Sequence, residues 1–516
     1  MLFNSYEFLF AFLPATLLTF FVIGRFGMRS AAGALALASF VFYAWWDVRY
    51  VLLLAASIAW NYLVGLATGR AGAAGRRSVA VWATFVGVAG NLAALGFFKY
   101  AGFAVSNWDA LTGSGYSIPR IVLPLGISFF TFTQIAFLID TYRGIAREYN
   151  PVHYALFVTY FPHLIAGPIL HHKEMMPQFE SPATYAPRAE NFAVGLTIFA
   201  LGLAKKVLLA DGIAPYANEV FDAAARGDAP TLFIAWGGVV AYALQLYFDF
   251  SGYSDMAIGL SRLFGVRLPL NFDSPYKATN IVDFWRRWHM TLSRFLRDYL
   301  YFPLGGSRRG PVRRYLNLMI VMLLGGLWHG AGWTYVLWGA LHGAYLIVNH
   351  AWRAACDAFR FRPSGRVHHV VGVGITFVAV LFAWTLFRAS DLTVAGSMIG
   401  GMIGHNGISV PAALMPAFGP LGPFFAEHGI SFALGGGTQF VKMCAWIVVL
   451  LPVVFIAPNT QQIMGRFAPA LGYADSQARV WLEWMPTPAW AIVAGGIAAF
   501  AVLALTQHSE FLYFQF

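Results

Sequence analysis

Residues 315–352 read YLNLMIVMLLGGLWHGAGWTYVLWGALHGAYLIVNHAW, a run without a single Asp, Glu, Lys or Arg. A helix needs about 20 predominantly apolar residues to cross the hydrocarbon core of a bilayer, so this run is long enough to be embedded in one. We therefore expect lipid, and not water, to be the solvent that selects the fold.

The composition of the whole chain supports the same class. Hydrophobic residues make up 59% of the 516 positions and charged residues only 11%, whereas soluble domains carry about 25% charged residues. The sequence predicts an all-α polytopic membrane protein with about 11 to 13 membrane-embedded helices, some of them re-entrant. A β-barrel would instead show short alternating strands. The apolar segments are 7–25, 31–47, 50–68, 79–98, 119–140, 152–170, 190–210, 231–250, 316–349, 369–388, 441–457 and 487–506.

Basic residues alternate between successive predicted loops, as expected when Lys and Arg are retained in the cytoplasm. This pattern predicts cytoplasmic odd-numbered loops and an N-terminus outside. Residues 7–25 lack a basic n-region and a clean cleavage site, so we expect a retained helix. Segment 389–441 has no Lys or Arg and is predicted to lie outside. The basic residues of the first, third and fifth loops are Arg25 and Arg29, then Arg70, Arg76 and Arg77, then Arg143 and Arg147.

Charge and cysteine content restrict the classes of partner. A net charge of +11 would suggest nucleic acid in a soluble protein, but cytoplasmic loops explain the same excess here, and no nucleic acid partner is expected. Cys356 and Cys444 have no CxxC partner, so neither a zinc nor a redox site is predicted, and free buried thiols are favoured over one disulfide. We expect one membrane-embedded domain, 1–516, with a motif-rich catalytic region at 244–350.

Segment 283–300, DFWRRWHMTLSRFLRDYL, predicts an amphipathic helix at the membrane interface. It either anchors the chain on anionic lipid or also shapes the mouth of a catalytic tunnel. The Gly- and Pro-containing turn after it, and the basic run through Arg314, predict a cytoplasmic loop that could also attract the phosphates of a nucleotide-bearing donor. The apolar stripe is Phe284, Trp288, Leu292, Phe295 and Tyr299.

His329 is the leading candidate for chemistry. It lies in LGGLWHGAGW (324–333), within the charge-free run. A polar ring there is costly unless it is hydrogen-bonded or lines a wet cavity, and broken backbone at membrane depth requires a covering of protein or a cavity. A core histidine with a satisfied partner is the alternative. His342 would lie about 140° away on one continuous helix, so we expect a structural or supporting role for it unless the glycines break the helix.

Other polar residues of the region leave alternatives open. His289 and Trp285 are spaced i to i+4 in segment 283–300, as are Asp283 and Arg287, so each pair is expected to share a helix face. Asp249 lies with Asp255 near the end of an apolar span. Paired carboxylates can do acid–base work, but helix caps or partners for nearby arginines are the favoured explanation.

Three blocks of sequence resemble the membrane-bound O-acyltransferase superfamily. They are LQLYFDFSGYSDMAIGLSRLFG (244–265), NFDSPYKATNIVDFWRRWHMTLSRFLRDYLYFPLGG (271–306) and LGGLWHGAGWTYVLWGALHG (324–343). Supporting pieces are LPLGISFFTFTQIAFLIDTYRG (123–144) and YFPHLIAGPIL (160–170). Within the superfamily, the branch of the alginate O-acetyltransferase membrane subunits is most similar. The resemblance covers about residues 1–350 well and is weaker beyond.

The resemblance implies a helical body with a central tunnel through thinned membrane. It implies that His329 is the catalytic histidine and His289 the second polar position of the site. On this basis we expect His329 to act as the general base that accepts a proton from an acceptor hydroxyl, while the sequence identifies no oxyanion donor. Candidates for lining the tunnel or contacting the donor are Trp328, Trp333, Trp285, Asp283, Arg286 and Asp249.

The resemblance also implies the substrates and the compartment. The donor would be acetyl-CoA, with no bound cofactor, and the acceptor an exported polysaccharide outside the bacterial inner membrane. Because the chain has no GxSxG nucleophile, a periplasmic acyltransferase partner could carry the later chemistry. A lipid or protein acyltransferase of the same superfamily and a transporter or flippase are the competing classes, although the chain shows no internal repeat of the kind common in transporters.

Overall fold

The computed structural model describes residues 1–361, 364–434, 437–473, 480–505 and 511–512. Helices dominate this part of the chain, which agrees with the predicted all-α class, and the described strands form one two-stranded sheet. The chain forms two compact units, each assembled from separate segments. Unit 1 comprises residues 1–204, 252–271 and 460–516, and unit 2 comprises residues 205–251 and 272–459.

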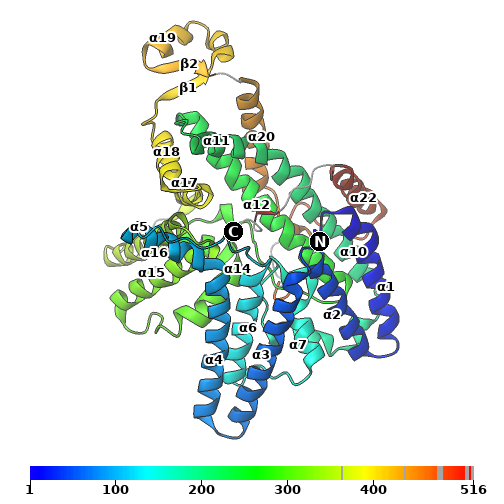
Figure 1. Cartoon of the computed structure of the whole chain (residues 1–516). Helices are drawn as coiled ribbons and strands as arrows, with labels where there is room; N and C mark the ends of the chain where they lie inside the picture. Colours follow the sequence, from blue (N-terminus) through cyan, green and yellow to red (C-terminus); the bar gives the residue numbers. More distant parts are fainter. Residues whose placement is uncertain (362–363, 435–436, 474–479, 506–510, 513–516) are drawn as a thin grey trace. The chain divides into compact units, whose positions relative to one another are not determined.

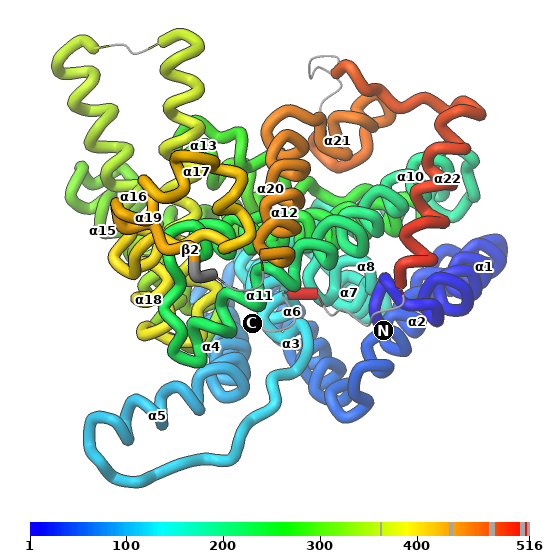
Figure 2. The backbone as a smooth tube through the Cα atoms, turned by 90° about the horizontal axis from the view of Figure 1, so that it is seen from above, coloured from blue at the N-terminus to red at the C-terminus, as the bar shows by residue number. Residues whose placement is uncertain are grey.

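Unit 1 contains the N-terminal helices. Within it α3, α4 and α6 pack side by side (Figure 1), as do α10 and α22 (Figure 2). Its elements are η1 (Phe8–Phe12), α1 (Leu13–Gly24), α2 (Met28–Ala44), α3 (Arg49–Ala73), α4 (Arg77–Leu95), η2 (Gly96–Tyr100), α5 (Ala101–Thr112), α6 (Ile127–Tyr142), α7 (Pro151–Thr159), α8 (Phe161–Leu164), α9 (His172–Phe179), η3 (Pro182–Tyr185), α10 (Ala189–Ala204), α21 (Thr460–Ile463), η8 (Gly465–Phe467) and α22 (Pro488–Leu503).

Unit 2 contains the motif-rich helices and the two strands. The long helix α12 (Leu232–Leu263) contributes residues to both units. The other elements of unit 2 are η4 (Lys205–Ala210), α11 (Asp211–Ala225), η5 (Pro275–Lys277), α13 (Ile281–Arg287), α14 (Met290–Leu296), η6 (Arg297–Tyr301), α15 (Gly310–His329), α16 (Trp333–Ala358), α17 (Gly365–Arg388), α18 (Leu392–Met402), β1 (Ile408–Pro411), η7 (Ala412–Phe418), α19 (Leu421–Glu427), β2 (Ile430–Leu434) and α20 (Gly437–Phe455).

Six of the described helices are long and apolar enough to cross a membrane. Four shorter apolar helices accompany them, at Phe8–Gly24, Met28–Ala44, Leu392–Met402 and Pro488–Leu503. The predicted total of 11 to 13 membrane-embedded helices stays a prediction, because length and composition alone do not decide the crossings. The six long helices are Arg49–Ala73, Arg77–Thr112, Ala189–Ala225, Leu232–Leu263, Gly365–Arg388 and Gly437–Phe455.

Two predicted helices are shorter than expected. The apolar segment 152–170 is not one helix: α7 ends at Thr159, and α8 is a single turn. Pro162 has no N–H to continue the helical ladder, which explains the interruption. The segment is nevertheless almost fully buried, so its apolar composition reflects burial within the protein. In the predicted segment 119–140, helix α6 begins only at Ile127, after Gly126 in the left-handed conformation.

The charge-free run forms two helices and not the single span predicted at 316–349. Helix α15 ends at His329, the backbone of Gly330 and Gly332 is extended, and α16 begins at Trp333. The two helices pack directly against each other (Figure 2). A Cβ on Gly326 would collide with the carbonyl oxygen of Tyr335, so this glycine is what lets the two backbones approach.

Segment 283–300 is amphipathic as predicted, but it is not one continuous helix. It breaks at Trp288 and His289 into α13 and α14, followed by the π-helical turn η6. Adjacent residues on a helix point about 100° apart. Since both Trp288 and His289 are buried, the interruption lets two consecutive side chains face the protein interior.

The segment without Lys or Arg, 389–441, begins as a helix of the protein body. Asp391 caps α18 by accepting hydrogen bonds from the backbone N–H groups of Thr393 and Val394, and α18 packs on α11 and α17. Beyond it, β1 and β2 pair in parallel. The sequence did not suggest these strands.

The two cysteines are free thiols, as favoured from the sequence. The expectation that they are buried is wrong, since both Cys356 and Cys444 are half-exposed to the surroundings. Cys356 lies on α16 and Cys444 on α20. Both helices are apolar, so a thiol on an outward face can border other apolar groups without a hydrogen-bond partner.

Candidate active site

His329 is the last residue of α15, and its side chain is buried. Its ring lies 4.9 Å from the ring of Trp328, 5.1 Å from Trp338 and 5.2 Å from Phe387, all in edge-on geometry. These neighbours come from α15, α16 and α17. The break at Gly330 thus places an imidazole at a helix end, inside a wall of aromatic rings from three helices.

His289 occupies the break between α13 and α14 and is fully buried. Its backbone is left-handed, with φ of +42°, a conformation that costs a non-glycine residue roughly 1 kcal/mol or more. Its ring lies 4.9 Å from Phe250 of α12 and 6.2 Å from Trp328. A glycine at this position would adopt the same backbone conformation without strain. A buried histidine that is retained there despite the strain is therefore a candidate for function.

The structure brings the two predicted catalytic histidines to the same indole. Trp328 contacts His289 and His329, with ring centroids 6.2 Å and 4.9 Å away. Trp328 is buried as well. The predicted grouping of these residues in one site therefore agrees with the geometry of unit 2.

His342 also joins this aromatic cluster. Its ring lies 4.7 Å from Trp338 and 5.1 Å from Trp285. On one continuous helix His342 would have faced away from His329. Because the chain breaks after His329, Trp338 of α16 contacts both His342 on its own helix and His329 on α15. His342 is fully buried, and neither ring nitrogen has a hydrogen-bond partner within the described residues. Its predicted supporting role remains a prediction.

The remaining candidates divide between this cluster and the surface. Trp285 contacts Trp338 and His342, but the helix break removes the predicted i to i+4 relation between Trp285 and His289. Trp333 is 54% exposed at the start of α16 and does not belong to the buried cluster. Arg286 is exposed.

Asp283 has the structural role that its spacing predicted. Its Oδ1 accepts a hydrogen bond from Arg287 Nε at 2.9 Å, an i to i+4 ion pair on α13. Its backbone N–H donates to the side chain of Asn280, which caps the helix. Asp283 therefore stabilises the first turn of α13.

Asp249 is also a structural residue, with a partner that the sequence did not suggest. Its Oδ1 lies 2.7 Å from Nζ of Lys206, and Asp211 lies 2.8 Å from the same nitrogen. Of the three expected alternatives, a helix cap is wrong, because Asp249 lies in the middle of α12. Acid–base work and an arginine partner stay untested, and the ion pair seen here is with a lysine. The missed signal was Lys206 itself, a charged residue in the apolar segment 190–210. Asp255, the other carboxylate, belongs to unit 1 and accepts a hydrogen bond from Gln461.

The chemistry available in the cluster is that of imidazole. A histidine can accept and return a proton near neutral pH, and aromatic walls exclude water from the reacting groups. Among the described residues, no three His, Cys, Asp or Glu side chains are grouped so that they could hold a metal ion.

Comparisons with known proteins agree with the resemblance seen in the sequence. Residues 120–390 match the membrane-bound O-acyltransferase (MBOAT) family. The chain is 38% identical to a peptidoglycan O-acetyltransferase of Helicobacter pylori, over 100% of this chain and 98% of that protein. It is 39% identical to a probable alginate O-acetylase of Pseudomonas aeruginosa, over the full length of both.

A more distant relative matches about half of the chain. A teichoic acid D-alanyltransferase of Streptococcus thermophilus is 27% identical over 51% of this chain and 68% of its own length. The full-length matches extend the similarity past residue 350, beyond the region in which the sequence motifs were clear.

We predict that the Lys206–Asp249 pair stabilises the fold. In Lys206→Met, two carboxylates lose their cation, and breaking a buried pair in this way costs about 3–5 kcal/mol. The measurement is thermal unfolding of the purified protein in detergent. Lys206→Met/Asp249→Leu should recover part of the loss, because both buried charges are removed together.

The neighbouring Lys205 provides the matched control, since its side chain is only half-buried. Lys205→Met should unfold close to the wild-type temperature. An equally small effect of Lys206→Met would show that the buried pair contributes nothing to stability.

Proposed function

The chain belongs to the membrane-bound O-acyltransferase family, and from that premise we propose that it moves an acetyl group from a cytoplasmic donor to hydroxyls of an exported polysaccharide. The observation that carries the proposal is the combination of full-length similarity to two glycan O-acetyltransferases with a buried imidazole cluster. The transfer is made directly or through a periplasmic acyltransferase partner.

Polysaccharide is the acceptor class favoured by the relatives. Two full-length relatives are named for peptidoglycan and alginate, which are different glycans, and the more distant one for teichoic acid. Each of the three names describes the transfer of an acyl group to a polymer. The general test is mass analysis of surface glycan from cells with and without this protein, in which loss of ester-linked acetyl groups is expected.

We assign the general-base role to His329. A sugar hydroxyl is a weak nucleophile because its pKa is far above 7. As its oxygen attacks the acetyl carbonyl carbon of the thioester, the neutral imidazole accepts the hydroxyl proton. The carbon–sulfur bond then breaks, and the proton passes to the departing sulfur. The products are an acetyl ester and a free thiol, and His329 returns to its neutral form.

Acetyl-CoA is the proposed donor, because the activated acetyl thioester is available in the cytoplasm. A central tunnel would let a cytoplasmic thioester and an outside hydroxyl meet at His329. Arg308 and Arg309, in the turn before α15, belong to the basic run that could also attract the donor's phosphates. The chain has no GxSxG nucleophile, which supports a separate partner for any later covalent step.

The proposed location is the bacterial inner membrane, with the N-terminus outside. The positive-inside pattern of the loops supports this orientation. It places the first loop, with Arg25 and Arg29, in the cytoplasm and segment 389–441 outside. The membrane lipid is then a permanent neighbour of the protein, and we expect no nucleic acid partner.

We predict that His329→Ala and His329→Gln abolish acyl transfer without preventing folding. General-base catalysis contributes about 10²–10⁴-fold in rate, so transfer should fall by at least that factor. The assay is acetyl transfer by purified protein at matched concentrations. His350→Ala is the control, because His350 is a half-buried histidine on α16 outside the aromatic cluster. Transfer at a near wild-type rate by folded His329→Ala would remove the assignment.

We predict that position matters more than charge in segment 283–300. His289→Ala should impair transfer much more than Arg297→Gln, because His289 contacts Trp328 while Arg297 is exposed and paired with Asp298. Rates are compared at saturating and limiting donor in membranes containing equal amounts of protein. Equal, small effects would leave the segment as an anchor and exclude His289 from the site.

We predict that segment 389–441 faces the outside of the cell. Single cysteines introduced at exposed positions, such as Glu427→Cys, should react with membrane-impermeant reagents in intact cells. A cysteine replacing Arg77, in the third loop, should react only after lysis. The reverse pattern would invert the proposed topology.

A further inference from the structure

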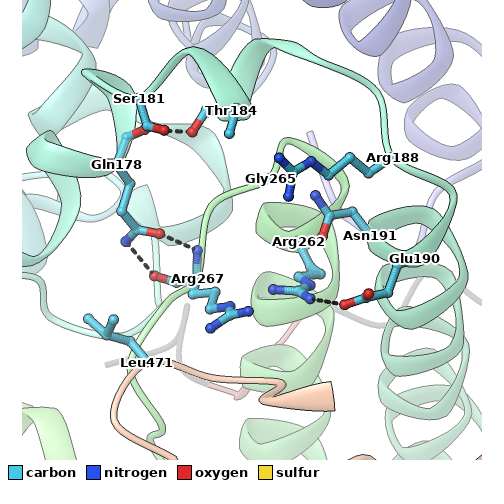
Figure 3. A pocket seen from close by; sticks show the side chains of 11 residues that line it. Gln178, Ser181, Thr184, Arg188, Glu190, Asn191, Arg262, Gly265, Arg267 and Leu471 are labelled. Atoms are coloured by element: carbon cyan, nitrogen blue, oxygen red, sulfur yellow. Dashed lines mark hydrogen bonds and ion pairs between the residues drawn. The ribbon is translucent and has the colours of Figure 1, made fainter.

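Unit 1 contains a pocket of about 350 Å³ where α10 begins and α12 ends. Arg188, Arg262 and Arg267 line it, and Glu190 is its one acidic residue among those described. Figure 3 shows the three arginine side chains around the same opening. The pocket therefore carries a net positive charge, and its remaining polar lining includes amide and hydroxyl groups that can bind an anion.

The pocket is held by rigid contacts. Helices α10 and α12 approach closely at Gly195, which has no side chain. A Cβ added there would lie only 2.8 Å from the carbonyl oxygen of Gly259. On the other wall, Gln178 accepts a hydrogen bond from the backbone N–H of Arg267 at 2.9 Å and donates to its carbonyl at 3.0 Å. These bonds fix the backbone of Arg267 and leave its guanidinium group for another partner.

Internal ion pairing does not account for all three arginines. Arg262 donates to Glu190 at 3.0 Å, and its side chain is 4% exposed. The Nε of Arg262 is buried and has no hydrogen-bond partner among the described residues. Within the same part of the chain, neither Arg188 nor Arg267 has a carboxylate within ion-pair distance. A structural ion pair would require one arginine, whereas the pocket has three.

The position of the pocket suggests where its ligand comes from. Both α10 and α12 belong to helices long and apolar enough to cross a membrane, and the pocket lies at their ends. The end of α1 is nearby, since the ring of Phe20 stacks on Tyr185 at 5.2 Å, and the basic first loop follows α1. Basic pockets between the ends of membrane helices bind the phosphates of anionic head groups.

We propose that this pocket binds a phosphate-bearing anion. The phosphate is carried by the head group of an anionic phospholipid or by a soluble phosphate compound, and the guanidinium groups of Arg188 and Arg267 contact it beside buried Arg262. Arginine presents a planar fork of donors that matches phosphate geometry. The site is distinct from the aromatic cluster of unit 2, and its occupancy can be measured without any acyl transfer.

The test is binding to the full-length protein in detergent. Phosphatidylglycerol and phosphatidylcholine are compared by native mass spectrometry, and inorganic phosphate and CoA by calorimetry. Each arginine near a phosphate is expected to change affinity by roughly fivefold, so Arg188→Gln/Arg267→Gln should weaken binding by about 30-fold. Arg262 is left unchanged because its buried ion pair could be needed for folding.

Two further variants separate the pocket from general surface charge. Arg76→Gln/Arg77→Gln removes two exposed arginines elsewhere in unit 1 and should leave affinity within about twofold. Glu190→Gln removes the carboxylate that competes for Arg262 and should strengthen binding. A loss of phosphatidylglycerol binding confined to the pocket variant supports a lipid source, and the same pattern with phosphate or CoA supports a soluble one. Unchanged affinity, or equal loss in the Arg76/Arg77 control, overturns the proposal.

Discussion

The close contact between α15 and α16 is the constraint on which the candidate site depends. Helix backbones can approach this closely only where side chains are absent, and Gly326 and Gly339 each lie against a carbonyl oxygen of the opposite helix. Gly330 faces the ring of Tyr335, so a side chain there would also be excluded. The chain therefore turns directly after His329. As a result α16 returns alongside α15 and brings Trp338 to the ring of His329.

In unit 2 the buried lysine and the buried histidines have different surroundings. The charge of Lys206 is held between Asp249 and Asp211, so ion pairing compensates for its removal from water. The imidazoles of His289 and His342 lie among aromatic rings, where a neutral ring can be accommodated but a permanent charge would be costly. In their neutral form these two imidazoles need no ionic partner, whereas the ammonium group of Lys206 does.

The sequence predicted the class of the fold better than the local geometry of the backbone. Apolar length was sufficient to locate α3, α12, α17 and α20, because lipid selects long helices directly. The same signal failed at 152–170, where burial inside the protein produces an equally apolar segment. It also failed to locate the break at His289, since an apolar stripe reports which side chains are buried but not whether the backbone between them stays helical.

The site residues show the same limit. His329 could be singled out because an imidazole in a charge-free run is costly to bury, and the structure places its ring among aromatic side chains. Lys206 escaped notice because its two carboxylate partners are separated from it by 5 and 43 positions, and only the fold shows that they converge. Trp333 and Asp283 lie beside motif residues in the sequence. In the structure, Trp333 is exposed at the start of a helix and Asp283 forms an ion pair with Arg287.

The geometry of the cluster suggests how one family can modify unlike polymers. Trp328 contacts both His289 and His329, with ring centroids 6.2 Å and 4.9 Å away, so the two imidazoles share one indole as a neighbour. A base that removes a proton from a hydroxyl needs only that hydroxyl and the adjacent carbonyl carbon within reach. It need not recognise the rest of the sugar. The nearly equal identity of this chain to relatives named for alginate and for peptidoglycan is consistent with a common reaction centre. Selection of the polymer must then depend on residues outside the aromatic cluster, or on a separate protein that presents the glycan.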